Sequence, residues 1–338
     1  MSDHLAGSHD LVIFDLDGVV FLIEEPIPGA VEAVERLRAD GTAIAYATNN
    51  ASRRAADVAA LLTGMGVSAE PAEVLTSAGA SAALLADRLP AGARVLVVGA
   101  EALRAEVRDA GLTPVDRLED EPVAVVQGYG PEVGWKQLAE AVLAVRAGAV
   151  WYATNTDRTL PSPRGPLPGN GSLVAVLRTA LDREPDVVVG KPQPGLFRTA
   201  AGQAGAQRPL AVGDRLDTDI QGAVTAGFDS LLVLTGVSGP ADLLAAGADR
   251  RPTYVTADLS GLFGAAEDCR VPVSGPEAGG WRVSRQDDRA ELDGSGDPVD
   301  ALRLLCGVTW TGVPLTNITA TSGEARELLA SWGLHPAG

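Results

Sequence analysis

The chain has few cysteines, few aromatic residues and few lysines. Its two cysteines, Cys269 and Cys306, form neither a disulfide framework nor a zinc-ligand pattern, and this usage is typical of a reducing cytoplasm. Aromatic residues make up only 4% of the sequence, although apolar residues make up 46% of it. We therefore expect a mostly aliphatic core, which favours an α/β protein with buried parallel strands.

Long hydrophobic runs and an excess of positive charge are also missing. No segment approaches the ~18 apolar residues of a membrane-spanning helix, and the N-terminus lacks the basic and apolar regions of a signal peptide. The formal net charge of −17 disfavours binding to nucleic acid or to anionic membranes. We expect a soluble cytoplasmic protein with neither of these partners. An anionic small substrate would need a local positive centre, and the only lysines are Lys136 and Lys191.

Apolar runs of strand type alternate with segments of helical periodicity. Strands are expected at residues 11–14 and 42–47, each followed by a helix, and this alternation predicts a parallel, doubly wound sheet. A second α/β unit interrupts the pattern, which then resumes, and the chain ends in a small α+β module with a hairpin and two helices. The predicted domains are residues 1–78 (first part of the core), 79–185 (inserted α/β unit), 186–265 (second part of the core) and 266–338 (C-terminal module).

Polar residues suited to catalysis collect where four predicted strands end. In an open α/β sheet, the carboxyl ends of the strands line the ligand crevice, so residues far apart in the sequence can meet there. The residues at these four strand ends are Asp15 and Asp17, Thr48 and Asn49, Lys191, and Asp214 with Asp219.

The types of these residues fit phosphoryl transfer. A carboxylate such as Asp15 can attack phosphorus and form an acyl phosphate, which divides the hydrolysis into two easier steps. Asp17 can protonate the leaving group and then accept a proton from the attacking water. Because neighbouring carboxylates repel each other, a hard cation such as Mg²⁺ is required, with Asp214 as a distant ligand. Thr48 and Lys191 would hold the phosphoryl oxygens.

Each motif by itself also has a purely structural explanation. Asp-x-Asp-Gly is often only a turn after a strand, Thr48 can be a satisfied strand-end hydroxyl, and Lys191 can be a solvated loop lysine. Asp217 and Asp219 can be helix N-terminal acids that interact with the macrodipole, which is the whole role expected of Asp217. The occurrence of all motifs in this order, each after an apolar strand, favours the catalytic interpretation.

Together these motifs resemble those of the haloacid dehalogenase superfamily, phosphatase branch, over about residues 10–263. An insertion between the second and third motifs is similar to the type 2 cap of that superfamily. Four stretches resemble the subfamily of nitrophenyl-phosphatases, phosphoglycolate phosphatases and pyridoxal-phosphate phosphatases. They are Ile27-Pro28-Gly29-Ala30, Thr48-Asn49-Asn50, Thr154-Asn155-x-Asp157 and Pro168-Gly169-Asn170-Gly171-Ser172. The implied fold is a doubly wound core with an inserted α/β cap.

The resemblance implies a role for each motif residue. Asp15 would be the nucleophile, and Asp17 the general acid and base, with a backbone carbonyl that also binds Mg²⁺. Thr48 and Lys191 would steady the phosphoryl group, and Asp219 would act beside the metal, directly or through water. The implied metal ligands are Asp15, Asp17, Asp214 and Asp219.

The tail resembles a fragment of an acetyltransferase fold. Actinobacterial enzymes assigned as glycerol-3-phosphate phosphatases have a similar arrangement. This resemblance favours glycerol 3-phosphate as the expected substrate. The tail lacks a pyrophosphate loop of the Gln/Arg-x-x-Gly-x-Gly type, so acetyl transfer is not expected. Its helices look amphipathic, and we expect the tail to serve stability or assembly.

Residues of the cap must choose the leaving group, because the motif residues contact only the phosphoryl group. The predicted substrate contacts are Asn49, Asn155, Asp157 and Arg158, with Arg158 suited to a carboxylate such as that of phosphoglycolate. An ordinary polar turn is the structural alternative for the three cap residues. Dimerisation through the cap is a further hypothesis.

Other functions remain as alternatives at this stage. Phosphoglycolate, pyridoxal phosphate or nitrophenyl phosphate can replace glycerol 3-phosphate as the substrate. A dehalogenase would not need Asp17 or Mg²⁺, and a signalling receiver would lack the cap. A dinucleotide-binding protein would carry Gly-x-Gly-x-x-Gly after a strand, and Val98-Gly99-Ala100 falls short of that pattern. A non-catalytic module that binds a phosphorylated ligand is the alternative from another class.

Overall fold

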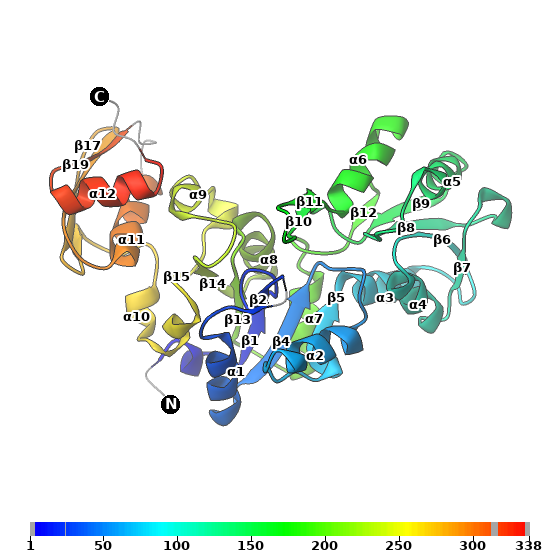
Figure 1. The fold of residues 1–338 in the computed structure, drawn as a ribbon, viewed down its shortest axis with the longest axis horizontal. Helices are drawn as coiled ribbons and strands as arrows, with labels where there is room; N and C mark the ends of the chain where they lie inside the picture. The colour runs from blue at the N-terminus through cyan, green and yellow to red at the C-terminus, as the bar shows by residue number, and fades with distance from the viewer. Residues whose placement is uncertain (1–3, 24, 312–316, 335–338) are drawn as a thin grey trace. The chain divides into compact units, whose positions relative to one another are not determined.

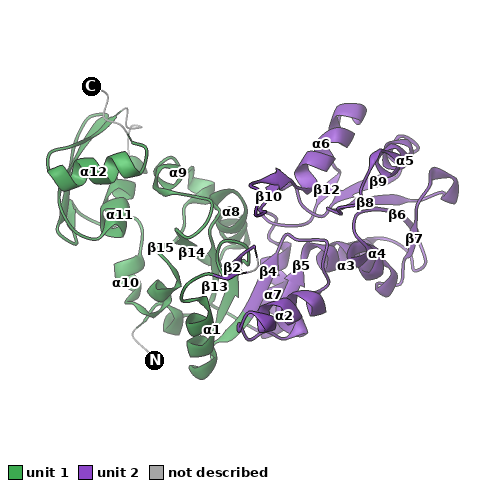
Figure 2. Ribbon diagram, viewed as in Figure 1, with its two compact units in different colours: residues 1–20, 27–44, 206–338 green, residues 21–26, 45–205 purple. Residues whose placement is uncertain are grey.

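The structure is a computed structural model that describes residues 4–23, 25–311 and 317–334. Parallel strands alternate with helices along the chain (Figure 1), so the predicted α/β class is confirmed. Within the described residues, no helix is both long and apolar enough to cross a membrane. The chain divides into two compact units (Figure 2), which consist of residues 1–20, 27–44 and 206–338, and of residues 21–26 and 45–205.

The first unit contains four parallel strands in the order β15-β14-β13-β1. The strands β1 and β13 are buried along their whole length, as expected for parallel strands that are covered on both faces. Their register pairs Phe14 with Val212, which brings the carboxyl ends of the two strands to the same edge. The four strands are β1 (Leu11–Phe14), β13 (Pro209–Gly213), β14 (Asp229–Val233) and β15 (Tyr254–Thr256).

Helical segments precede, connect and follow these strands. After β13 the chain forms a π-helical turn, η4, which continues as the helix α8. The helical segments before the C-terminal module are η1 (Ala6–Ser8), α1 (Ala30–Ala39), η4 (Leu216–Ile220), α8 (Gln221–Ala226), α9 (Pro240–Leu244), η5 (Ala248–Arg250), η6 (Leu259–Phe263) and α10 (Ala266–Cys269).

The C-terminal module belongs to the same unit and shares its hydrophobic core. Leu292 and Leu305 of the module lie in one buried cluster with Leu232, Leu243 and Val255 of the sheet and its helices. The predicted hairpin and both predicted helices are confirmed, and the sheet has the order β16-β17-β18-β19. The elements are β16 (Glu277–Ala278), β17 (Trp281–Gln286), β18 (Arg289–Gly294), α11 (Pro298–Thr309), β19 (Asn317–Ala320) and α12 (Gly323–Ser331).

The second unit contains a parallel sheet of five strands in the order β12-β9-β8-β6-β7. Successive side chains of β6 enter opposite clusters: Val95 packs with α3 and α4, whereas Leu96 packs with α5 and α6. Both faces of the sheet are therefore covered by helices. The elements are α3 (Ser77–Arg88), β6 (Arg94–Val98), α4 (Glu101–Asp109), β7 (Thr113–Val115), β8 (Ala124–Gln127), α5 (Trp135–Arg146), β9 (Val150–Ala153), α6 (Asn170–Leu181) and β12 (Val187–Val188).

Two segments differ from the sequence-based expectation. Strand β12 was expected in the resumed core, but it pairs with β9 of the five-stranded sheet. The Pro/Gly-rich segment 157–171, which the sequence predicts to be a long loop, contains the hairpin β10 (Thr159–Leu160) and β11 (Leu167–Pro168). The predicted domain boundaries stay predictions.

The second unit also contains the parallel pair β4 and β5 and several short elements. The first two residues of β4 fall in the first unit. These elements are β2 (Phe21–Leu22), β3 (Glu25–Pro26), β4 (Ala43–Thr48), α2 (Ala55–Gly64), η2 (Pro71–Glu73), β5 (Val74–Thr76), η3 (Leu118–Asp120) and α7 (Gly195–Ala204).

Candidate active site

Three carboxylates of the first unit meet at the carboxyl ends of β1 and β13. Asp15 follows β1, Asp214 follows β13, and Asp219 lies in the π-helical turn η4. One oxygen from each of the three lies within 4.8 Å of the others. Asp214 and Asp219 are 0% and 2% exposed, and Asp15 is half-buried. The structure therefore brings together three of the four predicted metal ligands.

Backbone amides hold this carboxylate cluster in place. Val237 N donates to Asp214 Oδ2 at 2.7 Å, and Arg215 N donates to Asp219 Oδ2 at 3.1 Å. The backbone N of Asp15 donates to the carbonyl of Val212 at 2.8 Å, which extends the β1–β13 ladder by one residue. The orientation of each carboxylate-bearing segment thus follows from the adjoining strand or turn.

Glycines let the chain approach these carboxylates closely. A Cβ on Gly236 would lie 1.9 Å from Asp214 Oδ2, and a Cβ on Gly18 would lie 2.6 Å from the same atom. Gly18 also has a φ of +85°, which side-chain-bearing residues rarely adopt. A Cβ on Gly213 would lie 2.2 Å from the Cβ of Asp219. Larger residues at these positions would displace the carboxylates.

The donor set fits a hard divalent cation. Three carboxylates this close, two of them buried, repel each other strongly unless positive charge compensates them. Carboxylate oxygens are the ligands that Mg²⁺ prefers. The carboxylate of Asp17 is not a member of the cluster, and the role predicted for Asp17 as a ligand uses its backbone carbonyl.

Asp217, in the same turn, has a structural partner. Arg215 Nε and Nη2 donate to its two carboxylate oxygens at 3.1 and 3.0 Å. Burial raises the pKa of Asp217, but the hydrogen bonds and charge of Arg215 outweigh that effect and hold the pKa below its ordinary value. Asp217 is thus engaged by its neighbouring arginine, whereas Asp219 faces the other carboxylates.

In the second unit, the end of β4 meets the segment after β12. Lys191 is 2% exposed, and its Nζ donates to the carbonyl of Ala47 at 2.9 Å. Thr48 is 3% exposed, and its Oγ1 accepts from Asn50 N at 3.1 Å. Asn49 Oδ1 accepts from Lys191 N at 2.8 Å, and Asn49 Nδ2 donates to Lys191 O at 3.0 Å. The structure therefore brings Thr48, Asn49 and Lys191 together.

Two of the three predicted cap contacts join this group. Asn155 Nδ2 donates to the carbonyl of Asn49 at 2.6 Å, and Asn155 Oδ1 accepts from Asp157 N at 3.2 Å. Asn49 Nδ2 also donates to Asp157 Oδ1 at 3.3 Å. Arg158 is exposed at the base of the β10–β11 hairpin, where its carbonyl accepts from Gly169 N at 2.9 Å. No observation tests whether these residues contact a substrate, so that role stays a prediction.

Sequence reasoning missed two residues of this group. Ser77 is fully buried, and its Oγ donates to the carbonyl of Asn49 at 2.6 Å. A Cβ on Gly190 would lie 2.4 Å from Asn49 Oδ1, so the close approach of the two segments requires glycine there. The position of Gly190 directly before Lys191 was an available signal, whereas nothing in the sequence distinguishes Ser77 from other serines.

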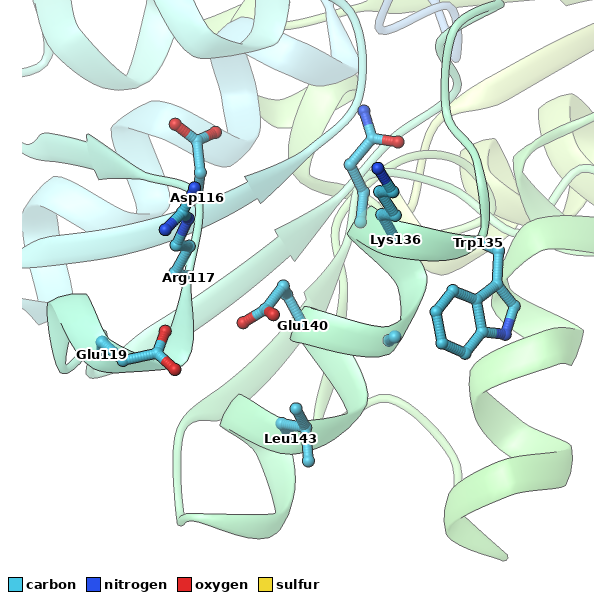
Figure 3. A pocket seen from close by; sticks show the side chains of 9 residues that line it. Asp116, Arg117, Glu119, Trp135, Lys136, Glu140 and Leu143 are labelled. Atoms are coloured by element: carbon cyan, nitrogen blue, oxygen red, sulfur yellow. The ribbon is translucent and has the colours of Figure 1, made fainter.

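A surface pocket of about 520 Å³ lies elsewhere in the second unit, between α5 and the segment around η3. Figure 3 shows the side chains that line it, with Trp135, Lys136 and Glu140 on α5 and with Asp116 and Glu119 on the other segment. The pocket is lined by none of the predicted site residues. Its lining carries both signs of charge, and nothing in it matches the chemistry of the strand ends.

The fold and the carboxylate cluster define an α/β protein with three carboxylates gathered at the ends of parallel strands. The sequence model of the haloacid dehalogenase-like hydrolases matches residues 12–113, and that of the related HAD-hydrolase-like family matches residues 188–262. A model of a GCN5-related N-acetyltransferase-like domain matches residues 278–334.

Known proteins match over most of the chain. The D-glycerol 3-phosphate phosphatase of Mycobacterium tuberculosis is 44% identical, over 98% of this chain and 96% of its own length. An acid sugar phosphatase of Staphylococcus haemolyticus is 35% identical, over 73% of this chain and 93% of its own length. The chain belongs to the haloacid dehalogenase-like hydrolase family.

Solved structures agree with this family. The crystal structure of the M. tuberculosis glycerol phosphate phosphatase in complex with magnesium matches with a TM-score of 0.91 and 44% identity, covering 99% of this chain and 100% of that one. The 4-nitrophenylphosphatase of Thermotoga maritima matches with a TM-score of 0.71 and 32% identity, covering 77% of this chain and 98% of that one. The predicted family, fold class and acetyltransferase-like tail are confirmed.

Proposed function

We propose that this chain hydrolyses phosphate monoesters with Mg²⁺, and that its substrate is glycerol 3-phosphate. The observation that carries the proposal is the cluster of half-buried Asp15 with buried Asp214 and Asp219 at the ends of parallel strands. The substrate is supported by the nearly full-length similarity to a glycerol 3-phosphate phosphatase, which includes the C-terminal module. The substrate class is a small phosphorylated metabolite.

The proposed mechanism has two steps. In the first, an Asp15 oxygen attacks phosphorus, and the bond between phosphorus and the glycerol oxygen breaks while Asp17 protonates that oxygen. In the second, Asp17 takes a proton from water, whose oxygen attacks phosphorus and releases Asp15 and inorganic phosphate. Aspartate suits this two-step reaction because its acyl phosphate is readily hydrolysed.

The motif residues also bind the metal ion and the phosphoryl group. Asp15, Asp214, Asp219 and the carbonyl of Asp17 would hold Mg²⁺, which when bound neutralises negative charge at the carboxylates and the phosphoryl oxygens. We assign Thr48 and Lys191 to the phosphoryl oxygens, as hydroxyl and ammonium donors. Both are almost fully buried, which strengthens their electrostatic interactions with an anion.

Discrimination between leaving groups is assigned to the turn after β9. Asp157 and Arg158 carry polar groups suited to hydroxyls or to a carboxylate. The position of Asp157 beside Asn49 and Lys191 supports this assignment.

Two assays test the proposal. Hydrolysis of p-nitrophenyl phosphate should require Mg²⁺ and cease in excess EDTA, and full turnover in EDTA would contradict the mechanism. A comparison of kcat/KM should then favour glycerol 3-phosphate over phosphoglycolate, pyridoxal phosphate and nucleoside monophosphates. If another of these is preferred by about ten-fold, or ~1.4 kcal/mol of transition-state free energy, the substrate assignment is wrong although the mechanism stands.

We also propose a homodimer formed through the cap and a cytoplasmic location. The exposed side chains of Trp135 (80%) and Leu143 (45%) on α5 support the dimer, because apolar side chains this exposed often lie in interfaces. Two buried free thiols support the reducing compartment. Sedimentation equilibrium should give twice the monomer mass for the wild type, and Trp135→Ser should shift the equilibrium toward monomer. A monomeric wild type would contradict the dimer.

A further inference from the structure

The amide side chain of Asn49 binds both backbone groups of one residue, Lys191. Asn49 Oδ1 accepts from Lys191 N at 2.8 Å, and Asn49 Nδ2 donates to Lys191 O at 3.0 Å. The side-chain amide thus makes the two hydrogen bonds that a paired strand residue would make with its backbone, and these bonds fix the direction of the chain at Lys191. The Lys191 ammonium reaches back to Ala47 O at 2.9 Å, so the lysine is held at its backbone and at its tip by neighbouring residues of the β4 end.

The contact depends on an unusually close approach of two segments. A Cβ on Gly190 would lie 2.4 Å from Asn49 Oδ1 and 2.6 Å from the carbonyl of Thr154. The chain thus has glycine at the position where a side chain would push the Lys191 segment away from Asn49. Asn49 is 9% exposed, so the polar atoms of its amide are bound mainly by protein groups.

The same residue connects the lysine to the turn after β9. Asn49 Nδ2 donates to Asp157 Oδ1 at 3.3 Å, and the Asn49 carbonyl accepts from Asn155 Nδ2 at 2.6 Å. Asn155 in turn accepts from the backbone of Asp157 at 3.2 Å, which shapes the turn. A buried chain of hydrogen bonds therefore runs from Lys191 through Asn49 to the turn that we assign to leaving-group selection.

We propose that Asn49 and Asn155 are positioning residues and do not contact the substrate. Asn49 sets the orientation of Lys191 toward the phosphoryl group, and Asn155 fixes the turn that carries Asp157. This inference rests on the proposed phosphatase function, and it replaces the substrate contact that the sequence suggested for these two asparagines. Its consequence is that the effect of Asn49 on hydrolysis does not depend on the leaving group.

The test compares Asn49→Ala with Asn50→Ala on glycerol 3-phosphate and on p-nitrophenyl phosphate, whose leaving group has no glycerol hydroxyls. Asn50 is the matched control, because it is an exposed asparagine next in the chain whose side chain binds Ser52 N at 2.7 Å. Asn49→Ala should lower kcat/KM about 10- to 100-fold for both substrates equally, the range typical of residues that orient a binding group. The inhibition constant of inorganic phosphate should rise as well. A loss confined to glycerol 3-phosphate, or no larger than that of Asn50→Ala, would overturn the proposal.

A second pair of variants keeps the test valid if Asn49→Ala does not fold. Asn49→Asp keeps the acceptor for Lys191 N but loses both donated bonds and places a carboxylate beside Asp157. Adding Asp157→Asn restores a donor toward position 49 and removes the repulsion. With p-nitrophenyl phosphate, which has no glycerol hydroxyls for Asp157 to select, kcat/KM of the double variant should be about tenfold higher than that of Asn49→Asp, within the usual range of coupling between contacting residues. Strict additivity of the two substitutions would refute the coupling.

The wild-type controls separate this proposal from the proposed function. If the wild type hydrolyses p-nitrophenyl phosphate but not glycerol 3-phosphate, the substrate assignment fails while the Asn49 comparison proceeds on p-nitrophenyl phosphate. If no ester is hydrolysed, the phosphatase proposal fails. Calorimetric binding of inorganic phosphate then decides: the positioning role requires weaker binding in Asn49→Ala than in Asn50→Ala, and equal binding contradicts it.

Discussion

The indole Nε1 of Trp310 donates a hydrogen bond of 3.1 Å to the carbonyl of Leu243, at the end of α9. Arg251 stacks over the same indole at 5.0 Å and donates to the Trp310 carbonyl at 3.2 Å. These contacts join the C-terminal module to α9 and to the loop that precedes β15. The buried cluster that spans both parts shows that the module completes a core and is not an appendage.

Substitution in this shared core should destabilise the whole first unit. Leu305 is fully buried in the cluster, so Leu305→Ala should lower the free energy of unfolding by about 2–5 kcal/mol, measured by urea titration. Val224→Ala, at a partly exposed position on α8 of the same unit, is the control and should change it by less than about 0.5 kcal/mol.

A chain truncated after residue 265 should be less stable or change its oligomeric state, yet keep Mg²⁺-dependent hydrolysis in any soluble product. A folded truncation that binds Mg²⁺ without activity would show that the module takes part in the chemistry.

The two aspartates of the first motif should respond differently to the same substitution. Asp15→Asn removes the nucleophile and should reduce kcat by at least about 10³-fold without loss of the fold. Asp17→Asn should cost ~10²–10⁴-fold, because only proton transfer is lost. A burst experiment with p-nitrophenyl phosphate checks both, together with circular dichroism for the fold. Wild-type rates in Asp15→Asn would remove the basis for the covalent route.

The glycine that borders the carboxylate cluster should be intolerant of a side chain. In Gly236→Ala the new methyl would lie 1.9 Å from Asp214 Oδ2, so the carboxylate must move and Mg²⁺ affinity should fall at least tenfold, about 1.4 kcal/mol. Gly202→Ala is the matched control, because Gly202 lies within α7 and an added Cβ meets nothing within 4 Å there. Titration calorimetry with Mg²⁺ measures both variants. Equal Mg²⁺ affinities in the two would exclude Asp214 from the metal site.

Arg158 should influence the choice between an acid and a polyol. If its guanidinium meets the carboxylate of phosphoglycolate, Arg158→Ala should lower kcat/KM for phosphoglycolate about tenfold, the loss expected for one charge-assisted hydrogen bond. The value for glycerol 3-phosphate should change much less. Arg164→Ala, an exposed arginine between β10 and β11, provides the control. Parallel losses for both substrates would contradict a role in discrimination.

The thiols of Cys269 and Cys306 should be unreactive in the native protein. Burial raises the pKa of the Cys306 thiol far above its usual range and also raises that of Cys269. An aromatic disulfide reagent at pH 8 should therefore label neither cysteine until the chain unfolds. Fast labelling of the native protein would contradict the burial of these thiols.

Because the thiol pKa values are raised by folding, the free energy of unfolding should decrease as the pH rises. Above the pKa of an unfolded thiol, about 8.5, the unfolded state releases the proton that the folded state retains. This contribution to stability is complete below that pH and is lost as the pH rises above it. Urea unfolding between pH 7 and 10 should show the decline, and Cys306→Ala should make it shallower. An unchanged slope in that variant would assign the decline to other groups.

The sequence by itself determined the buried strands that precede the motifs, the strand-end motifs and the family. A run such as residues 11–14 followed by Asp15 is a local pattern, and an apolar run that ends in a polar residue predicts the strand and its carboxyl end together. The hairpin of the tail was predictable for the same reason, since its two strands are close in the sequence. The residue types at the strand ends then indicated the chemistry.

Only the tertiary structure decided which distant segments meet. Asn49 and Lys191 are 142 positions apart, and no local pattern distinguishes an asparagine that binds a backbone from one that binds a substrate. The pairing of β12 with β9 and the core shared between Leu243 and Leu305 have the same origin. Each depends on burial and hydrogen bonding between segments that come together only when the chain folds, because a side chain's partners are set by packing across the whole fold.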